Sequence, residues 1–179
     1  MQQLLFSSWG RVRARLLGTA VVALAASGAN AQAPAHLAWL DAHYDQTATT
    51  ARTIWEFAEV GYQETRSSAL LQEQLASAGF SVEPGVADIP TAFVASYGSG
   101  EPVLAILGEF DALPGITQDA VPQRSPLSDK PAGHACGHHL FGAGSAAAAL
   151  AVKAWLDETG NSGTIRFYGR CGFMRWVCI

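Results

Sequence analysis

The strongest constraint on the fold is the uninterrupted apolar run VLAIL at residues 103–107. A short apolar run of this kind is typical of a β-strand that is buried on both faces. Two acids, Glu109 and Asp111, follow it, and Pro114-Gly115 then turns the chain into a polar loop that continues to about Pro131. Because loops at the carboxyl ends of buried strands often carry the chemistry of α/β proteins, we expect a functional site here.

Helix and strand patterns on both sides of this run predict an α/β domain. Apolar residues at three- and four-residue steps predict helices, and short β-branched or aromatic runs predict strands. In chain order, the expected elements are two helices at 37–60, closed by Gly61, and 67–78, and then three strands at 80–83, 91–97 and 102–110. An alanine-rich helix at 140–156, ended by Gly160, and a strand at 164–168 follow. This order predicts a central β-sheet flanked by helices.

The first 31 residues are predicted to be a secretion signal. Three arginines at 11–15 precede an uncharged apolar run at 16–26, and Ala29-Asn30-Ala31 has the small-x-small pattern of a cleavage site before Gln32. The apolar run is shorter than the roughly 20 residues that span a bilayer. We therefore expect a periplasmic or secreted protein, free of the membrane after cleavage, with one domain at 32–169.

Charge and cysteine content narrow the function classes. The signal holds three of the 11 basic residues and none of the 15 acids, so the remaining 148 residues have a formal charge of −7. This acidic balance argues against a nucleic-acid partner. Three cysteines are an odd number and cannot form a complete disulfide framework, so at least one cysteine needs another explanation.

One short segment, AGHACGHHLF at 132–141, concentrates one cysteine and three histidines. Cys136 and His138 are two residues apart and can face the same side of an extended loop, as two ligands of a metal would. A thiolate at a helix entrance is stabilised by the positive end of the helix. His134 and His139 could be further ligands, orient the first ones or bind substrate, and the acids after the apolar strand could approach the same ion.

Three other interpretations of this segment stay open. The histidines could belong to an ordinary loop that caps a helix. Gly142 to Ala147 formally satisfies the dinucleotide pattern G-x-G-x-x-A, although no buried strand leads into it and close helix packing explains the glycines better. Cys136 could also be the nucleophile of a thiol hydrolase with His138 or His139 as its base.

Five segments together resemble a known family. In order, they are GYQETRSSALL at 61–71, IPTAFVASYGSG at 89–100, ILGEFDALPG at 106–115, GHACGHHLFGA at 133–143 and GTIRFYG at 163–169. They are similar to the N-terminal part of the metal-dependent amidohydrolase branch of the aminoacylase and carboxypeptidase G metallopeptidases. The resemblance covers about residues 36–169.

The resemblance implies an incomplete zinc-peptidase-like catalytic domain. It also implies two divalent ions, Zn²⁺ or Mn²⁺, and hydrolysis of an amide bond in an N-acyl amino acid or a p-aminobenzoyl-glutamate-like compound. It makes Cys136 and His138 metal ligands and Asp111 a supporting acid. His139 stands where the family often has aspartate or asparagine, and His134 is a possible supporting group. The intact family forms homodimers through a smaller domain, which we do not expect of this chain.

The sequence departs from the family after Gly169. The family continues into P-A-E-E, whose first glutamate moves the proton, whereas residues 170–179 read RCGFMRWVCI and no glutamate follows Glu158. We expect a divergent, frameshifted tail at 170–179, no general base, and therefore an inactive or merely metal-binding polypeptide. We also expect the strand at 164–168 to lack neighbours, which would leave open sheet edges.

Overall fold

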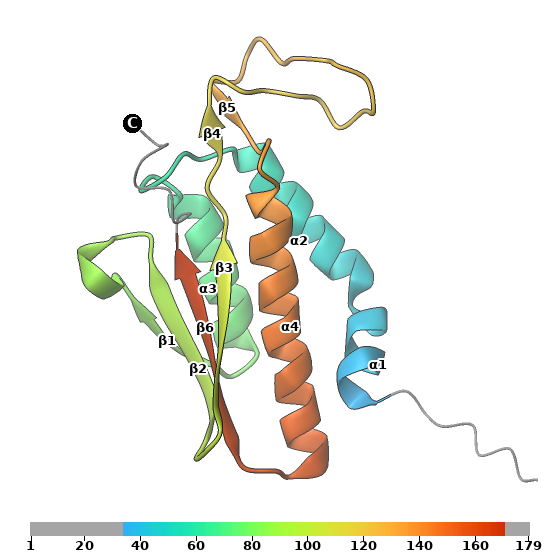
Figure 1. Ribbon diagram of the computed structural model, residues 1–179, viewed down its shortest axis with the longest axis vertical. Coiled ribbons are helices and arrows are strands. Elements are labelled where there is room, and N and C mark those ends of the chain that lie inside the picture. The colour runs from blue at the N-terminus through green and yellow to red at the C-terminus, as the bar shows by residue number, and fades with distance from the viewer. Residues whose placement is uncertain (1–33, 171–179) are drawn as a thin grey trace, which may run out of the picture. The chain divides into compact units, whose positions relative to one another are not determined.

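The computed structural model describes residues 34–170 (Figure 1). The expected secretion signal at 1–31 and the tail beyond Arg170 lie outside these residues. Within the described part, no helix is long and apolar enough to cross a membrane.

A four-stranded mixed sheet forms the centre of the domain. Its strand order is β1-β2-β6-β3, where β1 is Ser81–Pro84, β2 is Phe93–Ser99, β6 is Gly163–Arg170 and β3 is Val103–Glu109. β2 is antiparallel to both β1 and β6, whereas β3 runs parallel to β6. A separate two-stranded sheet joins β4 (Leu113–Pro114) to β5 (Ala132–Gly133) and closes the base of the intervening loop.

Helices lie on one side of the main sheet (Figure 1). α3 (Thr65–Ser77) and α4 (His138–Thr159) contact its strands, whereas α1 (Ala35–Ala42) and α2 (Tyr44–Phe57) pack mainly on α4. A short 3₁₀ helix, η1, at Val86–Asp88 connects β1 to β2. The sheet side chains directed at the helices are fully buried, among them Phe93 and Phe167, and they join Leu71, Leu75 and Ile54 in one core. The predicted α/β class, with a sheet and packed helices, is confirmed.

Glycines let α4 lie directly against the end of β3. A Cβ on Gly142 would stand 2.7 Å from the carbonyl oxygen of Glu109, so a larger residue would push the helix away. The chain enters α4 through Gly137, whose φ of +78° is in the left-handed region. The predicted end of this helix at Gly160 is confirmed, since that residue is its left-handed C-cap. The packing therefore sets the first turn of α4 beside the carboxyl end of β3.

The single helix expected at 37–60 is wrong in two respects. The segment forms two helices, α1 and α2, because His43 leaves the helical conformation, stacks on Trp39 and bonds the Trp39 carbonyl oxygen through Nδ1 at 2.8 Å. The second helix ends at Phe57 rather than at Gly61. Ala58 adopts the left-handed conformation with φ +49° and supplies the C-cap that was expected of glycine.

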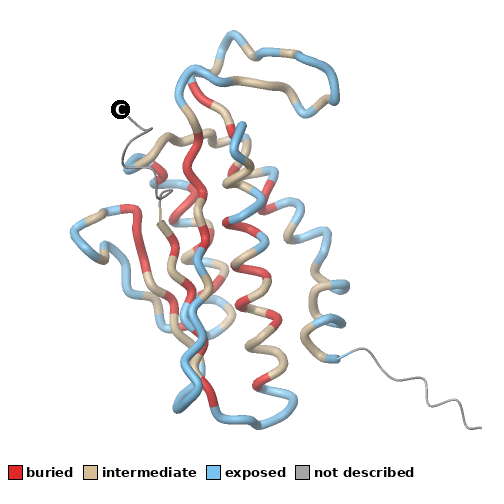
Figure 2. Tube along the Cα trace, in the orientation of Figure 1, coloured by how far each residue is buried: buried red, intermediate tan, exposed pale blue. Residues whose placement is uncertain are grey.

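The expectation that VLAIL is buried on both faces is also wrong. β3 is an edge strand, and Val103, Leu104 and Leu107 are 43%, 51% and 46% exposed (Figure 2). The strand β6, which was expected to lack neighbours, is instead paired on both sides, by β2 and by β3. Leu104 and Ile106 share the face of the buried Ile165 and Phe167, whereas Val103 and Leu107 lie on the opposite, exposed face of the sheet. Periodicity does not distinguish such a strand from one that is covered on both faces.

Candidate metal centre

The candidate site lies where β3 ends and α4 begins. Glu109 is the last residue of β3, Asp111 follows two residues later, and His138 is the first residue of α4. Asp111 and His138, which are 27 positions apart in the sequence, are thereby in direct contact. The structure confirms that the acids after the apolar strand approach the histidine and cysteine segment.

His138 is held between two carboxylates. Its Nδ1 is 2.9 Å from Oδ1 of Asp111, and its Nε2 is 3.2 Å from Oε2 of Glu109. The Asp111 side chain is only 2% exposed, whereas those of Glu109 and His138 are 15% and 21% exposed. Asp111 therefore lies behind the ring, and the Nε2 side of the ring is the side that solvent or an ion can reach.

This arrangement suits a cation beside Nε2. When Nδ1–H donates to Asp111, the Nε2 of a neutral ring is an acceptor that faces the acceptor oxygen of Glu109. A second proton on the ring satisfies both contacts, and so does a metal ion between Nε2 and Oε2. Zinc bonds of about 2.0–2.2 Å to nitrogen and carboxylate oxygen place two ligand atoms a little over 3 Å apart, which matches the 3.2 Å separation. The buried Asp111 then has the usual place of a carboxylate that orients a metal-binding histidine.

Arg170 adds a positive charge on the other oxygen of Glu109. Its Nη2 is 3.8 Å from Oε1, and the side chain is 30% exposed. At this length the pair is a loose ion pair rather than a strong hydrogen bond. Glu109 can therefore offer one oxygen to Arg170 and the other to His138 or to an ion.

Cys136 lies in the turn before α4 and is an exposed, free cysteine. Among residues 34–170, no three His, Cys, Asp or Glu side chains are already arranged around a common point so as to hold one ion. The residues present fit a metal through His138 and Glu109, and Cys136, two residues before His138, is the sequence-predicted candidate for a third ligand. The assignment of Cys136 and His138 as a ligand pair stays a prediction.

His134 and His139 lie side by side behind this site. Their ring centroids are 4.9 Å apart, and Nε2–H of His134 donates to the carbonyl oxygen of Ile54 in α2 at 3.1 Å. Burial and the neighbouring His139 lower the pKa of His134 to about 4. Burial and the nearby His138 also lower the pKa of His139. Both rings are therefore neutral near pH 7, and His134 ties the start of the site to α2.

Sequence reasoning missed a buried acid next to Asp111. Glu64 is fully buried, and its Oε2 accepts a hydrogen bond of 2.8 Å from the Thr91 hydroxyl, while Oε1 has no hydrogen-bond partner in the described part. Burial, with the Asp111 charge as a smaller cause, raises the pKa of Glu64. From the sequence, an acid just before a helix is expected to be an ordinary N-terminal cap, so no sequence signal marked Glu64 as buried. The capping carboxylate is Glu59, which accepts from the backbone N–H of Ser67 at 2.9 Å.

Close helix packing explains only part of the dinucleotide-like pattern at 142–147. Gly142 is required by the contact of α4 with Glu109, but a Cβ on Gly144 would meet nothing within 4 Å. The glycines follow the turn at 134–137 rather than a long buried strand, which the dinucleotide fold requires. Close packing therefore accounts for the first glycine and not for the second.

Comparisons with known proteins identify the relatives of this chain. It is 48% identical over 117 residues to a subunit of the p-aminobenzoyl-glutamate hydrolase of Escherichia coli K12, an alignment that covers 65% of this chain and 24% of that protein. It is 31% identical over 132 residues to the human Xaa-Arg dipeptidase, covering 66% and 26%. No family model matches the sequence. The chain thus spans about a quarter of the length of these curated relatives.

A solved structure with a similar fold is also a peptidase. A dinuclear metal-binding peptidase of the M20 family from Bacillus subtilis superposes with a TM-score of 0.54 at 25% identity, over 72% of this chain and 35% of that one. In sequence and in fold the chain is therefore similar to metal-dependent hydrolases of this kind, in agreement with the resemblance of the five sequence segments. Among its relatives is the p-aminobenzoyl-glutamate hydrolase of E. coli.

Proposed function

We propose that this chain is part of a metal-dependent amidohydrolase that cleaves the amide bond of an N-acyl amino acid or a p-aminobenzoyl-glutamate-like compound. The observation that carries the proposal is the position of His138 between Glu109 and Asp111, at 3.2 and 2.9 Å. The 48% identity to the p-aminobenzoyl-glutamate hydrolase sequence supports the substrate class.

The proposed cofactor is a pair of divalent ions, Zn²⁺ or Mn²⁺. The Bacillus subtilis relative is a dinuclear metal-binding peptidase, and a thiolate, an imidazole and a carboxylate together suit zinc. When bound, such an ion polarises the amide carbonyl and acidifies a water molecule. In this chain His138 and Cys136 would hold an ion, with Glu109 beside it.

Asp111 is proposed to fix the histidine for this task. By accepting a hydrogen bond from Nδ1–H at 2.9 Å, it selects the tautomer whose Nε2 lone pair points toward Glu109. Because Asp111 is nearly inaccessible, water does not compete for this bond. His134 and His139, both neutral near pH 7, add no positive charge that would repel a cation.

We further propose that the 179-residue polypeptide, assayed alone, does not hydrolyse amides. No glutamate follows Glu158, so the residue that serves as general base in the family has no counterpart in this chain. General acid–base catalysis contributes about 10²–10⁴-fold to a rate, and missing metal ligands weaken metal binding as well. A non-catalytic metal-binding polypeptide is therefore the second candidate for the isolated chain.

We also propose that the chain is exported to the periplasm or the medium. The basic start, apolar run and small-x-small site within residues 1–31 support a periplasmic or secreted location. The N-terminal sequence of the protein recovered from the periplasm or medium of an expressing bacterium is expected to begin at Gln32. Recovery of the chain from the cytoplasm with its first residues intact would contradict export.

Cobalt binding tests the proposed site and separates its alternatives. Co²⁺ added to the reduced chain is expected to give ligand-field bands, with a thiolate band that disappears in Cys136→Ser. His138→Ala is expected to abolish the bands, and Glu101→Gln, which changes an exposed acid before the same strand, to leave them unchanged. No spectral change on adding Co²⁺ would refute the metal site.

An amide-hydrolysis assay of the same samples tests the proposed inactivity of the isolated chain and the thiol-hydrolase alternative. We expect no p-aminobenzoyl-glutamate cleavage by the isolated chain in the presence of Zn²⁺ or Mn²⁺. Chelator-sensitive cleavage would refute the proposed inactivity but support the amidohydrolase chemistry. Cleavage that resists chelators and stops on alkylation of Cys136 would instead favour a thiol hydrolase.

A further inference from the structure

The pairing of β6 with β3 brings Arg170 to the candidate metal centre. The two strands are parallel, and their register places Glu109, the last residue of β3, opposite Arg170, the last residue of β6. β6 lies between β2 and β3 in the sheet, so hydrogen bonds on both sides fix the path of this strand. The approach of Arg170 to Glu109 is therefore a consequence of the strand register.

The two carboxylate oxygens of Glu109 have different neighbours. Oε1 is 3.8 Å from Nη2 of Arg170, and Oε2 is 3.2 Å from Nε2 of His138. The guanidinium of arginine is not deprotonated in proteins, so the positive charge beside Oε1 is permanent. Because the Glu109 and Arg170 side chains are only 15% and 30% exposed, solvent screens this charge less than it would at an open surface.

A cation at this centre can therefore use one oxygen of Glu109 more easily than both. An ion beside Nε2 of His138 reaches Oε2, which is the oxygen on its side. Chelation by both oxygens would move the ion toward Oε1 and bring two positive charges close together in a partly buried site, where their repulsion is strong. Asp111 does not replace the withheld oxygen, because it is 2% exposed and its Oδ1 accepts from Nδ1–H of His138.

We propose that Arg170 restricts Glu109 to one metal-binding oxygen and thereby makes the centre select Zn²⁺ over Mn²⁺. This inference rests on the proposed metal centre. Zn²⁺ is usually four-coordinate and binds nitrogen, sulfur and carboxylate oxygen, so it loses little when one oxygen of Glu109 is withheld. Mn²⁺ prefers octahedral sets of oxygen ligands and binds a given site more weakly than Zn²⁺, so it loses more.

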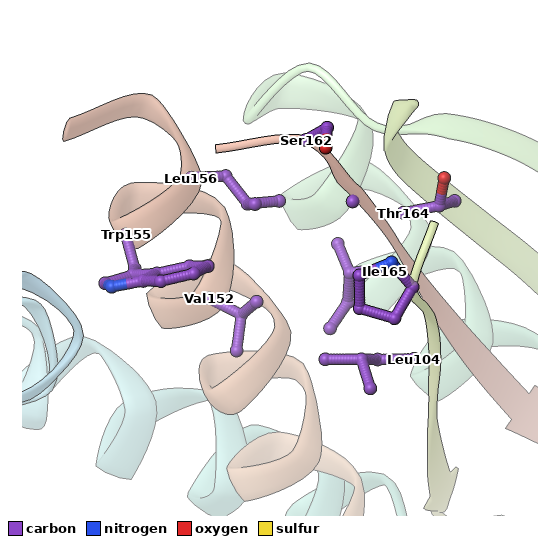
Figure 3. A pocket seen from close by; sticks show the side chains of 9 residues that line it. Leu104, Val152, Trp155, Leu156, Ser162, Thr164 and Ile165 are labelled. Atoms are coloured by element: carbon purple, nitrogen blue, oxygen red, sulfur yellow. The ribbon is translucent and has the colours of Figure 1, made fainter. Parts of the chain in front are cut away.

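The other end of the same two strands offers a metal ion no comparable place. There Leu104, Val152 and Trp155 are among the side chains that line an apolar groove of about 140 Å³ (Figure 3). None of the residues that line this groove is a histidine, cysteine, aspartate or glutamate. Added Zn²⁺ or Mn²⁺ is therefore expected to bind where Glu109 and Arg170 lie and not in the groove.

Metal titrations of Arg170→Met test the proposal. The substitution removes the charge and keeps an unbranched side chain. Competition with a chromophoric chelator measures the Zn²⁺ affinity, and the electron paramagnetic resonance signal of the free ion measures the Mn²⁺ affinity. We expect the affinity of the reduced full-length chain for Mn²⁺ to rise at least about tenfold and that for Zn²⁺ to rise by less than about threefold. Circular dichroism should show the fold of the parent chain.

Three further variants show whether the effect has the proposed cause. Arg170→Lys keeps a positive charge and should keep the preference of the parent chain for Zn²⁺. Arg166→Met removes an exposed charge from the same strand, opposite Ala105 rather than Glu109, and should change neither affinity. In a Glu109→Gln background, Arg170→Met should no longer shift the ratio of the two affinities, because the carboxylate through which Arg170 acts is gone.

The outcomes separate this inference from the metal centre on which it rests. Equal changes for the two ions would mean that Arg170 acts only through its general charge, and weaker binding of both would mean that it merely orients Glu109. Either result, or no change at all, would overturn the inference. If neither the parent chain nor Arg170→Met binds Zn²⁺ or Mn²⁺, the metal centre is refuted and the inference with it. Zn²⁺ binding that is lost in His138→Ala, with a preference over Mn²⁺ that Arg170→Met does not change, would refute the inference alone.

Discussion

In and after β3, the carboxylates are buried and the aliphatic side chains are exposed, which is the reverse of the usual distribution. At its carboxyl end the carboxylates of Glu109 and Asp111 are 15% and 2% exposed, whereas Leu104 and Leu107 in the strand itself are 51% and 46% exposed (Figure 2). Burying carboxylates is unfavourable unless they have partners, and leaving aliphatic side chains in water is unfavourable as well.

The difference teaches which part of the strand is organised within the chain. The polar end is organised within the chain, because His138 from α4 contacts both acids. The apolar part is covered on one side only, by β6 and α4, and no strand pairs with its outer edge in the described residues. A local polar site and an exposed apolar stretch thus share one strand, and they should respond to mutation in different ways.

The largest expected effect contrasts a buried aromatic residue with an exposed leucine. Phe167→Ala in β6 removes a fully buried ring from the core and should lower the free energy of unfolding by about 3–5 kcal/mol. Leu107→Ala, at an exposed position of β3, should lower it by less than about 1 kcal/mol. Urea unfolding measures both. A similar loss for the two variants would mean that Leu107 is buried in solution.

The next effect is a pH dependence at the polar end. His134 has a folded pKa of about 4, below its unfolded value of 6.5. Its neutral form is favoured by folding, so this contribution to stability is complete above pH 6.5 and is lost as the pH falls toward 4, by up to about 3 kcal/mol. His134→Gln, which keeps a hydrogen-bond donor, should flatten the stability curve between these values. Equal slopes for the two proteins in thermal unfolding would contradict this.

Loss of the buried acid behind His138 should weaken metal binding. Asp111→Asn keeps the shape of the side chain but removes the charge that fixes the Nδ1–H tautomer. Groups that orient metal-binding histidines typically contribute 10–100-fold to affinity, so we expect a loss of that size in a zinc competition titration. Asp129→Asn, an exposed acid in the loop, is the control and should change nothing. Equal losses for both variants would show only a general effect of charge.

A smaller effect of opposite sign is expected from Glu64. Its pKa is raised by burial, so its contribution to stability is greatest below its unfolded pKa, about 4.3, and declines as the pH rises through that value toward the folded pKa. Glu64→Gln removes this decline and should be more stable than the parent chain near pH 7. Glu73→Gln, exposed on the helix α3 that follows Glu64, should stay within about 0.5 kcal/mol of the parent. Lower stability of Glu64→Gln at pH 7 would show that a charged Glu64 is needed.

The sequence predicted the order of elements and the position of the site, because both depend on local patterns. Apolar spacing located α3 and α4 to within a few residues, and Gly160 was correctly expected to end α4. The family segments placed Asp111 and His138 in one site before any geometry was known. The structure brings these two into contact at 2.9 Å.

What the sequence did not predict depends on contacts between distant segments. The break at His43 follows from the stacking of its ring on Trp39. The exposure of VLAIL follows from the place of β3 at the edge of the sheet and from the uncovered face on which Val103 and Leu107 lie. A run of apolar residues is the same in a central strand and at an uncovered edge. Glu64 was overlooked because its burial arises from the packing of α3 against the segment that contains Thr91.

Zinc affinity tests the central claim most directly. Competition with a chromophoric chelator should show that the reduced chain binds Zn²⁺ and that both His138→Ala and Glu109→Gln weaken binding at least about tenfold. The Glu101→Gln variant should bind as the parent chain does. Zinc binding that is unchanged by both site substitutions, or absent from the parent chain, would contradict a metal centre between β3 and α4.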